Sequence, residues 1–146
     1  MTAQEIQQQI QIWERKLDGL KQKDWDARKS REEAEDALNK VKNASQKTEA
    51  AVQDALSKIR QRVAQILGKT KFKTRYEAKT QEILCGSDTK AAMSEYSESI
   101  SALTRKYLDL DSKIEDYQRN IQEAKQNLDD LRRQLNIVSQ EEGDQP

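Results

Sequence analysis

The sequence contains no histidine, and only one cysteine and one proline. Without histidine a chain lacks the usual general base near neutral pH and the commonest zinc ligand, so triads and metal sites that depend on histidine are excluded. Cys85 has no second cysteine for an internal disulfide, and it lies in a predicted turn without an activating partner. Glycine-rich phosphate-binding motifs are missing too. We therefore predict a protein that is not an enzyme and that uses no metal, no other cofactor and no small-molecule substrate.

Long apolar runs are also absent. None approaches the roughly 20 residues that a bilayer-spanning helix needs, and residues 1–16 have neither the basic start nor the apolar segment of a cleaved signal peptide. We therefore expect no membrane span and a cytoplasmic protein, with export without a cleaved signal peptide left open. The 26 basic side chains balance 26 acidic ones, and this neutrality argues against nucleic-acid binding, which needs a basic surface.

The residues that are present favour helices. Apolar residues make up 34% of the chain and charged residues 36%, so a thick globular core is not expected. The four glycines and the single proline at the last position leave long stretches rich in Ala, Leu, Glu, Lys, Gln and Arg, which form helices readily. We therefore predict an all-α chain.

The first half carries a heptad pattern. Thr2 and Glu5 have the spacing of a capping box, which predicts a helix start there. A 4-3 spacing of apolar residues, typical of a coiled-coil seam, then runs through Ile6, Ile10, Trp13, Leu17, Leu20, Ala27, Ala34, Leu38, Val41, Val52, Ala55, Ile59 and Ile66. The same frame also lands on Asp24, Arg31, Ser45, Thr48 and Arg62. We expect the seam to pair loosely or to open around residues 24–34.

The second half has the same pattern without polar interruption. Its seam consists of Met93, Tyr96, Ile100, Leu103, Tyr107, Leu110, Ile114, Tyr117, Ile121, Ala124, Leu128, Leu131, Leu135 and Val138. Two glycines, Gly68 and Gly86, separate the halves and are able to end helices. We predict an elongated antiparallel helical hairpin over residues 1–140 that turns near Gly86, with a turn near Gly68 as the alternative. Residues 141–146 are predicted to form a disordered tail.

Several aromatic residues are candidates for binding a partner. Trp13 lies on the first seam, whereas Trp25 lies about 120° away around the helix and suits an interface anchor or an intramolecular cover. Phe72 and Tyr76 lie in a stretch that has eight basic residues and one acidic residue from position 58 to 79, either a solvated face or a docking surface. The seam tyrosines Tyr96, Tyr107 and Tyr117 suit packing against more than one helix, although ordinary hairpin core positions explain them equally well.

The region around Gly86 carries a family resemblance. Residues Leu84, Cys85 and Gly86, followed by Ala91, Ala92, Met93 and Tyr96, resemble the turn of the small helical partner proteins encoded beside LXG toxins of type VII secretion systems. The chain resembles the YwqH-like type most, which is related to the WXG proteins. In that group the turn commonly reads Trp-x-Gly, and here Leu84 stands where the tryptophan is expected.

The resemblance implies a targeting factor or chaperone. Such a bacterial protein binds the helical N-terminal region of an LXG toxin and promotes its export, alongside a second small helical protein. The partner-binding residues expected on this basis and on the aromatic pattern are Trp13, Trp25, Phe72, Tyr76, Gly86, Met93, Tyr96 and Tyr107. The alternative function is a coiled-coil stalk of a bacterial secretion or flagellar export apparatus. Self-association stays open, because apolar heptads permit it.

Overall fold

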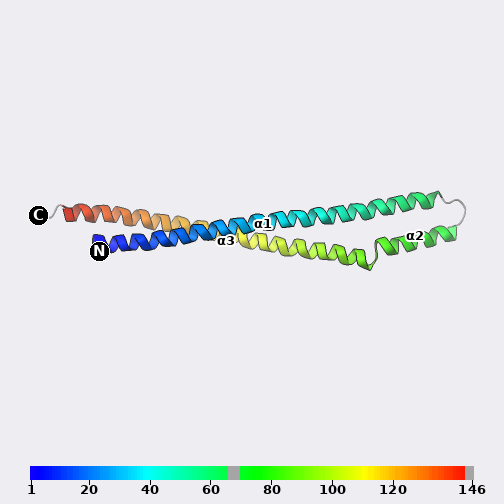
Figure 1. Cartoon of the computed structure of the whole chain (residues 1–146), viewed down its shortest axis with the longest axis horizontal. Helices are drawn as coiled ribbons and strands as arrows, with labels where there is room; N and C mark the ends of the chain where they lie inside the picture. The colour runs from blue at the N-terminus through cyan, green and yellow to red at the C-terminus, as the bar shows by residue number, and fades with distance from the viewer. Residues whose placement is uncertain (66–69, 144–146) are drawn as a thin grey trace. The chain divides into compact units, whose positions relative to one another are not determined.

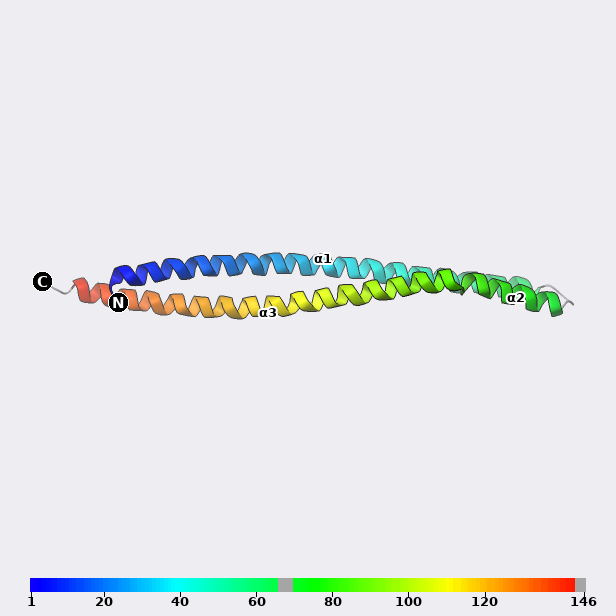
Figure 2. The same cartoon turned by 90° about the horizontal axis from the view of Figure 1, so that it is seen from below.

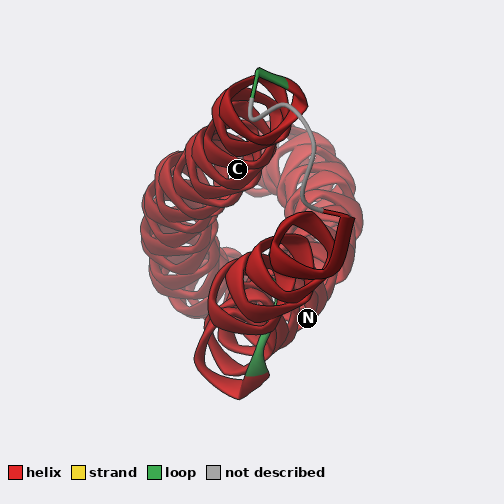
Figure 3. Cartoon of the chain, turned by 90° about the vertical axis from the view of Figure 1, so that its right-hand side faces the viewer, coloured by secondary structure: helices red, strands yellow, loops and turns green. Residues whose placement is uncertain are grey.

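The chain is helical wherever it is described. The computed structural model describes residues 1–65 and 70–143, with side chains over 1–65 and 74–143. In these residues it has no strand and three helices, α1 (Ala3–Ala64), α2 (Thr70–Leu84) and α3 (Ser87–Gly143) (Figures 1 and 3). No helix in the described ranges combines the length and apolar character that a membrane span requires. The all-α prediction is confirmed.

The capping box forms as predicted and starts α1. The backbone N–H of Thr2 donates to Glu5 Oε2 at 3.0 Å, and the backbone N–H of Glu5 donates to Thr2 Oγ1 at 3.3 Å. These two bonds satisfy N–H groups that have no partner inside the helix, which is why α1 begins at Ala3.

The chain reverses direction between α1 and α2, so the prediction of a turn near Gly86 is wrong. In Figures 1 and 2, α2 lies alongside the last turns of α1. Leu56 and Ile59 of α1 and Gln81 of α2 line the groove between them, and further back along α1 the Thr48 hydroxyl lies 3.3 Å from that of Tyr96 on α3. Both α2 and α3 are therefore antiparallel to α1. The reversal agrees with the alternative near Gly68, a residue that lies outside the described ranges.

Gly86 interrupts the helix without reversing it. Helical hydrogen bonds reach the break from both sides, because the Cys85 N–H donates to Gln81 O at 2.8 Å and the Lys90 N–H donates to Gly86 O at 3.0 Å. Gly86 thus takes the N-cap position of α3. Its backbone is not left-handed, and glycine is needed for another reason: a Cβ here would lie 2.1 Å from the backbone oxygen of Glu82.

The contacts divide the chain into two compact units. Unit 1 comprises Met1–Glu33 and Tyr107–Pro146, and unit 2 comprises Ala34–Lys106. In unit 1 a core cluster consists of Ile6, Ile10, Leu128 and Leu131, and Trp13, Leu17, Leu135 and Val138 pack against it. In unit 2 the buried apolar side chains are Ala34, Leu56 and Val63. The single domain predicted for residues 1–140 stays a prediction. The predicted tail overlaps α3, which ends at Gly143, and residues 144–146 lie outside the described ranges.

Burial follows the predicted seams closely, with one shift. All fourteen residues predicted for the second seam are buried or half-buried in α3. Every residue of the first seam as far as Ile59 is buried or half-buried, but Leu56 is more buried than its in-frame neighbour Ala55, and Val63 is completely buried whereas Arg62 is exposed. The frame predicted for the last turns of α1 is therefore wrong by one residue, because Val63 gains more than Arg62 from leaving water.

Candidate partner-binding surfaces

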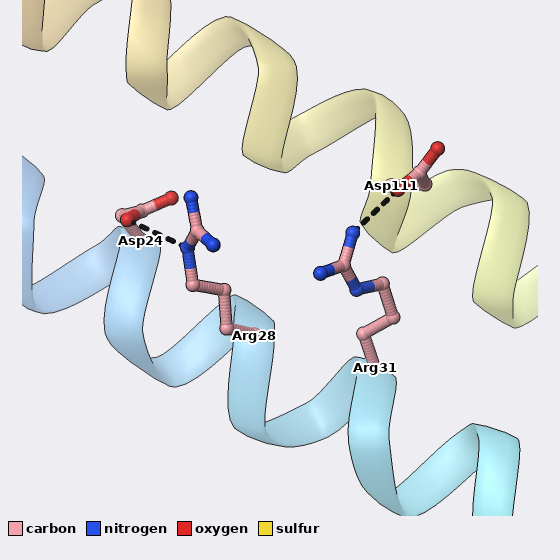
Figure 4. A network of polar contacts seen from close by, with 4 residues as sticks. All are labelled: Asp24, Arg28, Arg31 and Asp111. Atoms are coloured by element: carbon pink, nitrogen blue, oxygen red, sulfur yellow. Dashed lines mark hydrogen bonds and ion pairs between the residues drawn. The ribbon is translucent and has the colours of Figure 1, made fainter.

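A layer of charged side chains interrupts the apolar seam of unit 1, where the sequence predicts loose pairing. Arg31 of α1 reaches Asp111 of α3, with Nη1 2.6 Å from Oδ1, while Asp24 pairs within α1 with Arg28 of the next turn at 3.0 Å (Figure 4). The Arg31 and Asp111 side chains are 29% and 42% exposed. An ion pair with such exposed side chains contributes little stability, on the order of 0–1 kcal/mol.

Asp24 is the least favourable member of this layer. Its side chain is only 17% exposed, and its Oδ1 atom is buried without a hydrogen-bond partner. The reason is its seam position, which faces the stretch of α3 that contains Gln118, Ile121 and Gln122 across a shallow groove. Arg28 reaches only Oδ2. Leaving a buried polar atom unpaired costs about 1–3 kcal/mol, so this layer weakens unit 1 locally.

Trp25 lies next to this layer and points away from the seam. It is 58% exposed, and the Lys29 ammonium lies 5.3 Å from the centre of its ring. The side chain therefore covers little of the protein's own surface. This agrees with the off-seam position that its spacing from Trp13 predicts, and it leaves a large aromatic face available for contact.

Trp13 has the opposite environment. It is half-buried and packs against the core cluster, as the seam predicts. The Lys16 ammonium lies 4.5 Å from its ring centre, and Trp13 lines a shallow groove with Gly19 and Leu20. Trp13 is therefore first a packing residue.

The other candidates on α3 are also seam residues. Met93, Tyr96 and Tyr107 are all half-buried. The Thr48 hydroxyl donates to Ala44 O at 2.9 Å, which uses its only proton, so the Tyr96 hydroxyl donates in turn to Thr48 Oγ1. Tyr96 therefore contributes a specific cross-helix hydrogen bond in unit 2 as well as apolar packing.

The candidate residues of α2 are Phe72 and Tyr76. Tyr76 is 41% exposed and lines a shallow groove with Arg75, Lys79 and Ile83. The side chain of Phe72 lies outside the described ranges. Sequence reasoning missed Ile83 as a surface residue although it is 71% exposed, and the signal was available, because Ile83 follows Tyr76 by seven residues on one helical face.

The described candidate residues fall in both units. Trp13, Trp25 and Tyr107 belong to unit 1, whereas Tyr76, Gly86, Met93 and Tyr96 belong to unit 2. Gly86 has a backbone role, set by the close approach to Glu82. The sequence thus identifies side chains at the surface and on the seams, but it does not predict how they divide between the two units.

No group of three or more His, Cys, Asp or Glu residues in the described ranges is arranged to hold a metal ion, and Cys85 is an exposed free thiol. No protein-family model, curated protein or solved structure matches the chain. The functional interpretation therefore depends on the surfaces described above and on the resemblance of the residues around Gly86.

Proposed function

We propose that the chain is a non-enzymatic binding protein that takes up α-helices of another protein beside its own helix pair. The exposure of Trp25 is the observation that supports this most. Large exposed aromatic residues are typical anchors of protein interfaces, because they bury much area at low entropic cost. Trp25 also adjoins Asp24, at the layer where the seam of unit 1 is weakest. A partner helix anchored on Trp25 thus meets the part of the helix pair that opens at the lowest cost.

The half-buried seams support the same proposal. Two helices cannot cover tyrosines as large as Tyr107 and Tyr117 from all sides, and both remain half-buried. In the proposed complex the heptad seams pair as a coiled coil, and a third or fourth helix covers these rings to give a mixed bundle. The apolar area that the partner buries there is the main source of affinity.

The partner that we propose is the helical N-terminal region of an LXG toxin of a type VII secretion system. The resemblance of Gly86, Ala91, Ala92 and Tyr96 to the LXG-associated proteins supports this choice. The chain then acts as a targeting factor that presents the toxin for export from the cytoplasm, together with a second small helical protein. Export of the chain itself with its toxin, without a cleaved signal peptide, belongs to the same proposal.

The test begins with an affinity pull-down of the tagged chain from its own source cells, followed by mass spectrometry. Recovery of a large protein with a helical N-terminal region and a toxin domain supports the proposal, and recovery of the chain alone contradicts it. Trp25→Ala should then weaken binding of that partner by about tenfold or more and leave the circular dichroism unchanged. Leu108→Ala, at a residue that is 59% exposed on α3, is the matched control and should change neither. Leu110→Asp, at a seam residue of α3, is the reference for loss of helicity. An equal loss of helicity in Trp25→Ala would contradict the anchor role of Trp25.

The position of the reversal favours a second candidate, a coiled-coil stalk of a secretion or flagellar export apparatus. Because the chain reverses between α1 and α2, the exposed residues Arg60 and Arg62 of α1 and Arg75 and Lys79 of α2 flank the bend, where they are available to an export ATPase. The pull-down distinguishes the two candidates, since recovery of an ATPase in place of a toxin would replace the first by the second.

A further inference from the structure

Two large apolar side chains of α2 face outward. Tyr76 and Ile83 are 41% and 71% exposed, and they lie two helical turns apart on the same face. The polar side chains of Glu77 and Gln81 line the groove against Leu56 and Ile59. A helix at a protein surface normally turns its apolar side toward the neighbouring helix. The outward face of α2 therefore has a composition that packing against α1 does not explain.

This face is a shallow groove with a basic border. Tyr76 and Ile83 form its apolar floor, and Arg75, Lys79 and Thr80 complete its lining. The side chains of Arg75 and Lys79 are exposed. Both stems are apolar and both ends are charged, so the same residues widen the apolar floor and set the sign of the charge around it.

The sequence around this groove is rich in positive charge. The stretch from residue 58 to 79 contains eight basic residues and one acidic residue. Unit 2 as a whole has fourteen basic and nine acidic residues, whereas unit 1 has twelve basic and seventeen acidic ones. The zero net charge of the chain thus hides an excess of five positive charges on the unit that carries this groove. An acidic occupant is favoured by this charge, which also speeds its association.

From this geometry we propose that the α2 groove, defined by Arg75, Tyr76, Lys79, Thr80 and Ile83, docks an acidic amphipathic helix of another protein. The two-turn spacing of the apolar residues fits a helix that presents apolar side chains at i, i+3 and i+7. A bilayer fits less well, because two large apolar side chains are few for interfacial anchoring. The groove belongs to unit 2, so its function does not depend on Trp25.

The proposal is tested with a designed helical peptide and the full chain. The probe is a fluorescein-labelled peptide of about 21 residues, three heptads, with Leu at a and d and Glu at e and g. Its counterpart has Lys in place of every Glu. Fluorescence anisotropy should show binding of the Glu peptide and at least about tenfold weaker binding of the Lys peptide. Raised salt should weaken the binding of the Glu peptide. The double substitution Arg75→Gln and Lys79→Gln should reduce this salt dependence.

Matched variants separate the groove from general stickiness. Ile83→Ser should weaken binding of the Glu peptide by about tenfold or more, since the buried Ile area is lost. Ile137→Ser is the control, because Ile137 is 57% exposed on α3 in unit 1, and it should leave binding unchanged. Trp25→Ala should also leave it unchanged, so that failure of this site is distinguished from failure of the Trp25 surface.

Four results would overturn the proposal. They are equal binding of the Lys peptide, an equal loss in Ile137→Ser, and retention of full affinity in Ile83→Ser. The fourth is a different occupant of the groove. It would be shown if the Glu peptide does not bind, while the chain binds phosphatidylglycerol vesicles or self-associates in sedimentation velocity, and Ile83→Ser abolishes that binding or self-association.

Discussion

Replacing Asp24 with leucine should stabilise the protein. The carboxylate occupies a seam position with its side chain 17% exposed, and its unpaired Oδ1 atom costs about 1–3 kcal/mol. The ion pair that the substitution removes contributes at most about 0.5 kcal/mol, because Arg28 is 43% exposed and lies one turn away on the same helix. Leucine adds apolar burial in return. Imperfect packing against Ile121 offsets part of this gain, so we expect a net stabilisation of about 1–2 kcal/mol.

The assay is urea unfolding of the full chain, followed by circular dichroism at 222 nm. A stabilisation of this size should raise the urea midpoint at unchanged m and the Tm by about 3–8 °C. Asp26→Leu is the matched control, because Asp26 is exposed and only bonds Gln22, and it should change stability by less than about 0.5 kcal/mol. If Asp24→Leu proves destabilising, or equals Asp26→Leu, the argument from the unpaired oxygen fails.

Three further substitutions test local features of the helices. Gly19→Ala should stabilise α1 by about 0.5–1 kcal/mol in urea unfolding, since nothing lies within 4 Å of the added Cβ; a loss of stability would contradict this. Gly86→Ala should lower the Tm, because its Cβ would lie 2.1 Å from Glu82 O, and an unchanged Tm would disprove the close approach. Tyr96→Phe should cost about 0.5–1.5 kcal/mol, and this cost should vanish in a Thr48→Val background, as a double-mutant cycle would reveal.

The parts of the fold that the sequence predicts well are those set by local or periodic patterns. The capping box needs only Thr2 and Glu5, and it forms as predicted. The seam of α3 repeats without a polar residue, so turning any other face of this helix toward its partner would expose apolar side chains. Both features are decided within one helix, and this is why composition and spacing suffice to predict them.

The reversal is set by pairing between distant residues, which spacing does not contain. Gly68 and Gly86 each end a stretch of helical pattern, and local chemistry gives Gly86 the better turn sequence. The observed pairs are Glu14 with Arg132, Arg31 with Asp111 and Thr48 with Tyr96, and each is centred in sequence on residues 71–73. A hairpin that turned at Gly86 would pair residues centred near that glycine. The choice between the two turns is therefore made by the whole length of the seams.

The shift of the first seam near its end has a related cause. An α-helix has 3.6 residues per turn, so a 3.5-residue pattern drifts by about 20° per heptad unless the helices supercoil. A strict frame places Ala55 and Arg62 on the seam, but the buried residues there are Leu56 and Val63. Both are larger and more apolar than their in-frame neighbours Ala55 and Arg62. The drift brings two adjacent positions about equally close to the partner helix. The larger and more apolar of the two residues is then the one that is buried.

Composition also conceals how charge is distributed, and this bears on the binding surfaces. A chain with 26 charges of each sign gives no reason to expect an electrostatic site. The fold separates them, because α1 and α3 each contribute to both units while the basic residues of 58–79 fall in unit 2 alone. Charges in water are screened beyond about 8–10 Å at physiological salt, so a docking helix responds to the basic residues near it and not to the net charge of the molecule. For this reason the neutral composition is compatible with a site that selects acidic helices at α2.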